Sequence, residues 1–125
     1  MNLGRLSNDA RAIRTLAAWL GDGGAPVGAS LALVRAETCT SCPHNKDAKT
    51  VERTIGKLIR DSEKVRLAIG ASLPGESALK TCEICNCYLP LKIWVPFKHL
   101  SQTQIPDMPP HCWVTKESKH NASNT

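Results

Sequence analysis

The first apolar positions of the chain recur at helical spacing. Within residues 9–20 they gather on one face, which comprises Ile13, Leu16, Ala17 and Leu20. Gly21 follows directly, and glycine is a common stop signal for a helix because it accepts a left-handed backbone. This pattern predicts a short amphipathic helix at the start of the chain.

A second helix is expected to begin at Pro26 and to deliver the chain to Cys39. Proline suits the first helical position, where its missing N–H would have no partner in any case. The spacing predicts a core-facing side made of Val27, Leu31 and Val34, with Arg35 and Glu37 facing solvent.

The clearest helical pattern covers residues 50–69, with Thr50 as a cap and Gly70 as a stop. Its predicted apolar face comprises Val51, Ile55, Leu58, Ile59, Val65 and Ile69. Opposite this face lies a basic stripe, defined as Lys49, Arg53, Lys57, Arg60 and Lys64. Evenly spaced cations can follow the phosphates of a nucleic acid. Charges on the outer face of an amphipathic helix are also common for solvation alone.

The pattern changes to alternation between Tyr88 and Phe97, which predicts a strand. Its two prolines would confine this strand to the edge of a sheet. A Pro-rich loop is expected over residues 101–110. We therefore expect one mainly helical domain with a small irregular β part over residues 1–115, followed by a polar, flexible tail over residues 116–125.

The chain has six cysteines in 125 residues and few aromatic side chains. A chain of this size gains stability when disulfides or a metal site cross-link it. No stretch of the sequence is long and apolar enough for a membrane span, and the first twenty residues lack a secretory apolar run. These features predict a cytoplasmic protein without membrane contact. Thiols stay reduced there, and CxxC pairs bind metal more often than they form disulfides.

The cysteines fall into two knuckle-like groups and one single position. Their spacing is Cys39-x-x-Cys42, then Cys82-x-x-Cys85-x-Cys87, then Cys112. Zinc favours four thiolate or imidazole ligands in a tetrahedron, and paired CxxC knuckles commonly supply them. All six cysteines are therefore predicted to lie near metal. The expected fold is a metal-stapled domain like a zinc ribbon or knuckle, with a helix inserted between the knuckles.

Several arrangements of these ligands are open. One ion can take four sulfurs, or two ions can share six thiolates. Two separate sites can also recruit His44 and His111, which lie near Cys42 and Cys112 in the sequence. Four cysteines also suffice for an iron–sulfur cluster, although the spacing differs from ferredoxin runs. A redox dithiol at Cys39 and Cys42 is the further alternative.

Charge and motifs point away from an enzyme. The chain has a formal charge of +5, which four thiolates on one zinc ion would lower to +3, so the folded protein is mildly basic. No metalloprotease, deaminase or phosphate-loop motif is present, and no small-molecule substrate is evident. The sequence favours a structural-zinc module that acts through the basic stripe on nucleic acid or an acidic partner. The alternatives are an adaptor that contacts a host or phage protein through the strand Tyr88–Phe97 or the loop 101–110, and an iron–sulfur protein with a redox or sensing role.

The combined pattern resembles a group of small bacterial and bacteriophage cysteine-cluster proteins of uncharacterised function. The resemblance implies metal binding and a phage or prophage origin, and it implies no catalytic residue. Asn86 stands where glycine is usual, and both residues suit a left-handed turn. The matching segments are Trp19-Leu20-Gly21, Pro26-Val27, Arg35-Ala36-x-x-Cys39-x-x-Cys42-Pro43-x-Asn45, Cys82-x-x-Cys85-x-Cys87, Lys92-Ile93-x-Val95-Pro96 and Cys112-Trp113.

Overall fold

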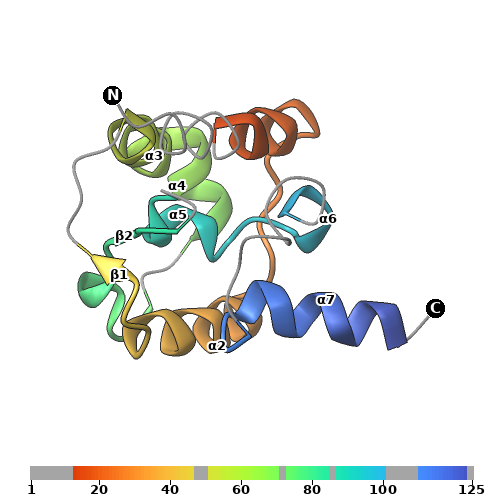
Figure 1. Cartoon of the computed structure of the whole chain (residues 1–125). Helices are drawn as coiled ribbons and strands as arrows, with labels where there is room; N and C mark the ends of the chain where they lie inside the picture. Colours follow the sequence, from red (N-terminus) through yellow and green to blue (C-terminus); the bar gives the residue numbers. More distant parts are fainter. Residues whose placement is uncertain (1–12, 47–50, 71–72, 85–86, 101–109, 124–125) are drawn as a thin grey trace, which may run out of the picture.

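The structure is a computed structural model that describes residues 13–46, 51–70, 73–84, 87–100 and 110–123. Over these ranges the chain is mainly helical with one two-stranded sheet, which confirms the predicted class (Figure 1). The other ranges include parts of the sequence analysis, namely residues 9–12 of the first predicted helix, Lys49, the predicted cap Thr50, the pair Cys85 and Asn86, residues 101–109 of the predicted loop, and residues 124–125 of the predicted tail.

The elements follow one another in this order. A helix over residues 13–21 precedes α2 (Ala29–Thr40), β1 (Asn45–Lys46), α3 (Val51–Asp61) and α4 (Glu63–Ile69). A short 3-10 turn, η1 (Glu76–Ala78), leads to β2 (Thr81–Cys82). The remaining helices are α5 (Leu89–Lys92), α6 (Phe97–Leu100) and α7 (Trp113–Ser123).

The first helix is present as predicted, and it inserts Leu16 and Trp19 into the core. The indole Nε1 of Trp19 donates a hydrogen bond to the carbonyl oxygen of Ala25 at 2.8 Å. This bond satisfies the polar end of a buried ring, as buried tryptophans require. Ala17, which was predicted to share the apolar face, is exposed.

Helix α2 is present, but its predicted orientation is wrong. Leu31 is 40% exposed and Val34 is 57% exposed, whereas Arg35 is buried. The guanidinium of Arg35 explains the rotation, because Nη1 donates to the carbonyl oxygens of Ile93 at 3.0 Å and Val95 at 2.8 Å. These bonds satisfy buried carbonyls that the following turn leaves without partners. The face that packs on the core consists of Ala32, Arg35, Ala36 and Cys39.

The predicted helix over residues 50–69 is two helices that meet at Ser62. The Ser62 hydroxyl accepts a bond from the backbone N–H of Val65 at 3.4 Å and donates to the carbonyl oxygen of Ile59 at 2.6 Å. Ser62 thus caps α4 while it ends α3. Gly70 ends α4 with a φ of +75°, as predicted. Leu58 faces solvent, although it was assigned to the apolar face.

The predicted strand from Tyr88 to Phe97 is wrong. Residues 89–92 form α5 and residues 97–100 form α6, and every residue from Leu89 to Val95 is buried. The alternation of residue types therefore did not indicate a strand, because the side chains at both the odd and the even positions from Leu89 to Val95 are buried. Helix α5 packs on α3, and Pro90 occupies its first turn, where proline is tolerated. The strand edge that an adaptor was expected to use does not exist.

Helix α7 takes up the segment that was predicted as a polar tail from residue 116. It runs beside α2 along one side of the molecule (Figure 1). Its first turn places Trp113 and Val114 in the core, and the carboxylate of Glu117 binds Arg35 on α2. Among the described helices, none has the length and apolar character that crossing a membrane requires.

Candidate metal centre

Two segments that are far apart in the sequence meet in the small sheet. Strand β1 pairs antiparallel with β2, so that Asn45 lies opposite Cys82. The side chain of Asn45 reinforces this pairing, since Nδ2 donates to the carbonyl oxygen of Ala78 at 2.9 Å and Oδ1 accepts from the backbone N–H of Lys80 at 2.8 Å. The sheet therefore brings the knuckle at residues 39–42 against the one that begins at Cys82.

Backbone hydrogen bonds fix the described ends of both knuckles. In the first, the backbone N–H of Cys42 donates to the carbonyl oxygen of Cys39 at 3.0 Å, which closes a tight turn. In the second, the backbone N–H of Cys82 donates to the carbonyl oxygen of Cys87 at 3.0 Å. Tyr88 pairs with Thr81 next to this bond. Cys82 and Cys87 are therefore neighbours in space.

A small cavity lies where the knuckles meet the start of α7. Its volume is about 20 Å³, which is room for about one water molecule or one ion. Its cysteine sulfurs come from the last turn of α2, the turn after it, β2 and the residue before α7, namely Cys39, Cys42, Cys82 and Cys112. His44 and Lys92 also line it. Cys87 is buried but is not part of the lining.

The sulfurs share this cavity without converging on one point. Among the residues that the structure describes, no group of three or more His, Cys, Asp and Glu side chains has the spacing of metal ligands. The five cysteines in the described ranges are free thiols. The zinc site and the six-cysteine ligand set therefore remain predictions. The cavity is where such a site would lie.

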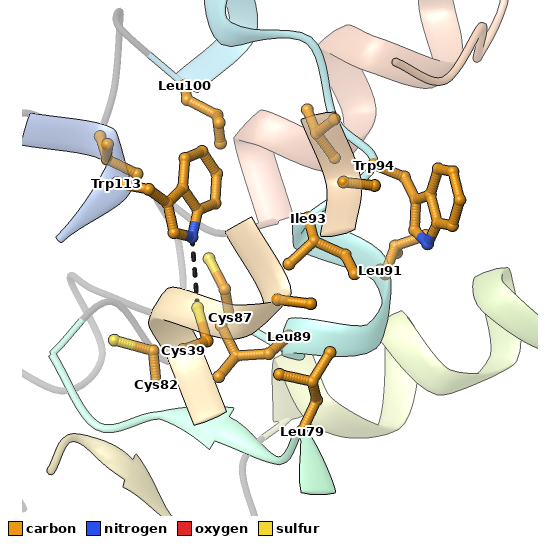
Figure 2. Packing of buried hydrophobic residues seen from close by; sticks show 14 of the residues in the cluster. Cys39, Leu79, Cys82, Cys87, Leu89, Leu91, Ile93, Trp94, Leu100 and Trp113 are labelled. Atoms are coloured by element: carbon orange, nitrogen blue, oxygen red, sulfur yellow. Dashed lines mark hydrogen bonds between the residues drawn. The ribbon is translucent and has the colours of Figure 1, made fainter. Parts of the chain in front are cut away.

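The lining of the cavity is mainly apolar, and it includes one buried lysine. Lys92 is only 3% exposed, and its Nζ lies 5.4 Å from the ring centroid of Trp113. The guanidinium carbon of Arg35 lies 4.2 Å from the same centroid. The Trp113 indole Nε1 donates to Cys39 Sγ at 3.2 Å, with the sulfurs of Cys82 and Cys87 in the same part of the core (Figure 2). Buried lysine and N–H donors are the groups that stabilise negative charge on sulfur.

Burial dominates the ionisation of Cys39. It raises the pKa of this thiol from the ordinary value of 9.0 to about 11, although the Trp113 hydrogen bond and Lys92 act in the opposite direction. Negative charge on Cys112 and Cys42 adds to the increase, which reflects how close these sulfurs are. Without metal, Cys39 is therefore protonated at neutral pH. A metal ion in the cavity would supply the positive charge needed to deprotonate it.

The outer side of the cavity carries two histidines. The Sγ atom of Cys42 lies 3.1 Å from His111 Nε2 and accepts the backbone N–H of His44 at 3.4 Å. His44 Nδ1 lies 2.7 Å from the carboxylate of Glu83, and the two imidazole rings stack with centroids 6.0 Å apart. A carboxylate on Nδ1 leaves Nε2 as the ligating atom of His44. His44 lines the cavity, whereas His111 is exposed on the solvent side of Cys42.

The structure divides the basic stripe. Lys57 and Lys64 are exposed, but they lie on different helices on either side of Ser62. Arg53 is half-buried. Arg60 Nη2 binds the carboxylate of Glu76 at 3.0 Å, and these side chains are only 13% and 16% exposed. Arg60 is thus part of the packing between α3 and η1.

Sequence reasoning missed two buried cations in this region, Lys92 in the cavity lining and Arg35 over the Trp113 ring. Arg35 and Lys92 were assigned by periodicity to solvent and to a strand, and neither position carries a local signal of burial. The adjacency of Cys112 and Trp113 was the one available hint, because a ring next to a ligand in sequence can also reach the cluster in space. Comparisons of the chain with known protein families, with curated proteins and with solved structures found no match.

Proposed function

We propose that this protein is a non-enzymatic binding module whose cysteine-lined cavity holds one structural zinc ion. The observation that carries this proposal is the cavity itself. Four thiols from four separate segments line a space for about one ion, and a buried lysine lines the same space. In this reading, metal ties together the zinc-knuckle segments and the start of α7.

Cys39, Cys42, Cys82 and Cys112 would hold the ion, with His44 as a further donor at the rim. When bound, zinc supplies coordination energy for folding and a positive charge that keeps the thiols deprotonated. Four thiolates on one divalent ion leave two net negative charges. Buried Lys92 and the Trp113 N–H would offset these charges, which accounts for a buried lysine in the lining of this cavity.

Elemental analysis of the untagged, anaerobically purified protein tests this proposal. We expect one zinc per chain, lost on acidification and restored on neutral reconstitution with zinc. The double variant Cys39→Ser/Cys112→Ser should lose the zinc, whereas Ser77→Ala, a change at an exposed residue of η1 that does not line the cavity, should retain it. A brown protein containing iron and sulfide would replace zinc with an iron–sulfur cluster. Protein that contains no metal and folds fully in a chelator would refute both.

The surface through which such a module acts is proposed to be the exposed basic side of α3 and α4. Lys57, Lys64 and Arg66 are exposed there, while Arg60 is neutralised by Glu76. Exposed cations without aromatic neighbours suit the phosphates of a duplex or an acidic protein rather than stacked single-stranded bases. This side of the molecule is the docking surface that we propose for an anionic partner.

A further inference from the structure

Cys42 differs from the other described cysteines in its exposure. Cys39, Cys82, Cys87 and Cys112 are buried, whereas Cys42 is partly exposed. A reagent in solution reaches a buried sulfur only after local opening of the fold. Within the described ranges, Cys42 is therefore the thiol that a small molecule meets first.

A groove lies beside the turn that carries Cys42, although Cys42 itself is not among the residues that line it. It has a volume of about 490 Å³, which is within the range of small-molecule sites. Ser41 and Pro43, the neighbours of Cys42 in the chain, form part of its wall. His111, whose Nε2 lies 3.1 Å from Cys42 Sγ, forms another part. Lys116 from α7 and Glu37 from α2 add one exposed cation and one exposed anion, so the groove suits a ligand that carries carboxylates together with an ammonium group, as glutathione does.

Cys39 is positioned to form a disulfide with Cys42. The hydrogen bond from the Cys42 N–H to the Cys39 carbonyl closes a tight turn. The Cα atoms at the ends of such a turn lie less than about 7 Å apart. Disulfides need Cα separations of about 4.4–6.8 Å. Both residues also line the same small cavity.

We propose that Cys42 is a modification site for anionic low-molecular-weight disulfides, and that the reaction ends in a Cys39–Cys42 disulfide. The Cys42 thiolate attacks one sulfur of the small disulfide, whose S–S bond breaks and releases one thiolate. The Cys39 sulfur then attacks Cys42 and releases the second, which carries the proton if Cys39 begins as a thiol. Two electrons pass from the protein dithiol to the small disulfide, which is reduced to two thiols.

This reaction has a consequence for α7 and for the cavity. Cys39 Sγ accepts the indole N–H of Trp113, the first residue of α7, so a change at this sulfur reaches that helix directly. The cavity would also lose two of the thiolates that are proposed to hold zinc. This last consequence rests on the proposed function, whereas the reactivity of Cys42 does not.

The test uses the full-length, zinc-loaded protein under anaerobic conditions with oxidised glutathione as the probe. The reaction is stopped at intervals with acid and an alkylating reagent, and each cysteine is then mapped by mass spectrometry. Glutathione is expected first on Cys42, followed by the Cys39–Cys42 disulfide. With the variant Cys39→Ser, the reaction should stop at the mixed disulfide on Cys42. This variant is assayed with and without zinc, because the loss of a proposed zinc ligand could itself change the reactivity of Cys42. Glutathione appearing first on any other cysteine overturns the proposal.

Lys116→Ala tests the groove. It should slow the reaction with oxidised glutathione by about twofold to fivefold while leaving the reaction with uncharged hydroxyethyl disulfide unchanged. If the wild type and the variant react at equal rates with both reagents, the groove does not bind the small disulfide. Protein that binds no metal but reacts first at Cys42 refutes the zinc proposal alone. Protein that binds zinc but reacts first elsewhere refutes this inference alone.

Discussion

Arg35 and Glu117 are joined by two hydrogen bonds although 82 positions separate them in the chain: Nε to Oε2 at 2.9 Å and Nη2 to Oε1 at 2.7 Å. The same guanidinium donates to two backbone carbonyls of the segment after α5. One side chain on α2 therefore holds both the buried central segment and the C-terminal helix. Parallel, charge-assisted bonds of this kind are among the stronger ones in proteins.

Replacing Glu117 tests how far this pair supports the fold. Glu117→Ala leaves a buried cation with only two neutral acceptors, and we expect the free energy of unfolding to fall by about 2 kcal/mol. Urea denaturation measures the change. Lys98→Ala is the control, because the Lys98–Asp22 pair is exposed on both sides and its loss should have little effect. Equal effects of the two variants would show that Arg35 does not need its carboxylate partner.

Ser62 carries the break between α3 and α4. Ser62→Ala removes the hydroxyl that caps α4, and we expect a loss of about 1 kcal/mol. Ser77→Ala is the matched control, since Ser77 is exposed and precedes no long helix. The measurement is thermal or urea unfolding of both variants. A Ser62→Ala protein as stable as the control would mean that packing of Val65 alone sets the start of α4.

The sequence predicted helices where hydrophobic and polar faces separate clearly, as in residues 13–21 and 51–69. It failed on α2 because periodicity treats a charged residue as solvent-facing. Arg35 is buried through contacts 58 and more positions away, which no local window contains. It failed again at residues 89–95, where complete burial removes the contrast between faces that alternation depends on.

The candidate site was predictable in its residue types but not in its surroundings. Cysteine spacing pointed to all six cysteines. The structure places Cys39, Cys42, Cys82 and Cys112 around one cavity and leaves Cys87 outside its lining, while Cys85 lies outside the described ranges. Lys92 could not be predicted there, because its role depends on α5 turning inward. For Arg60, the regular spacing of the basic residues predicted a surface position. The structure instead pairs it with the carboxylate of Glu76, which lies 16 positions later in the chain.

The raised pKa of Cys39 gives the metal-free protein a pH dependence. A thiol whose pKa increases from 9.0 to about 11 on folding stabilises the fold below pH 9, and this contribution is lost as pH rises toward 11. We expect about 2 kcal/mol to be lost over this interval. Cys39→Ala should lose correspondingly less between the same two pH values, since other groups ionise in both proteins. Parallel stability curves for the two proteins would contradict the assignment.

The exposed lysines of α3 and α4 are predicted to set the salt dependence of partner binding. If duplex DNA or RNA binds here, Lys57→Ala/Lys64→Ala should weaken binding and lower the slope of log affinity against log salt by about two. The control, Lys46→Ala/Lys80→Ala, removes the same charge from exposed positions near the small sheet. Equal slopes for the two variants would show that binding depends on the overall charge of the protein rather than on Lys57 and Lys64. Absence of nucleic-acid binding by the wild type would leave an acidic protein as the expected partner.

Lys92 is predicted to affect zinc affinity beyond its effect on the fold. Lys92→Met keeps the length of the buried side chain, and its free energy of unfolding is measured in metal-free protein so that the effect on the fold is known separately. In the zinc form the same variant removes the cation nearest the thiolates and should weaken zinc affinity by about tenfold, as outer-shell changes commonly do. Competition with a chromogenic chelator measures the affinity, and Lys98→Met provides the exposed control. A variant that binds zinc as tightly as wild type would show that Lys92 serves packing alone, and that the charge on the cluster is neutralised elsewhere.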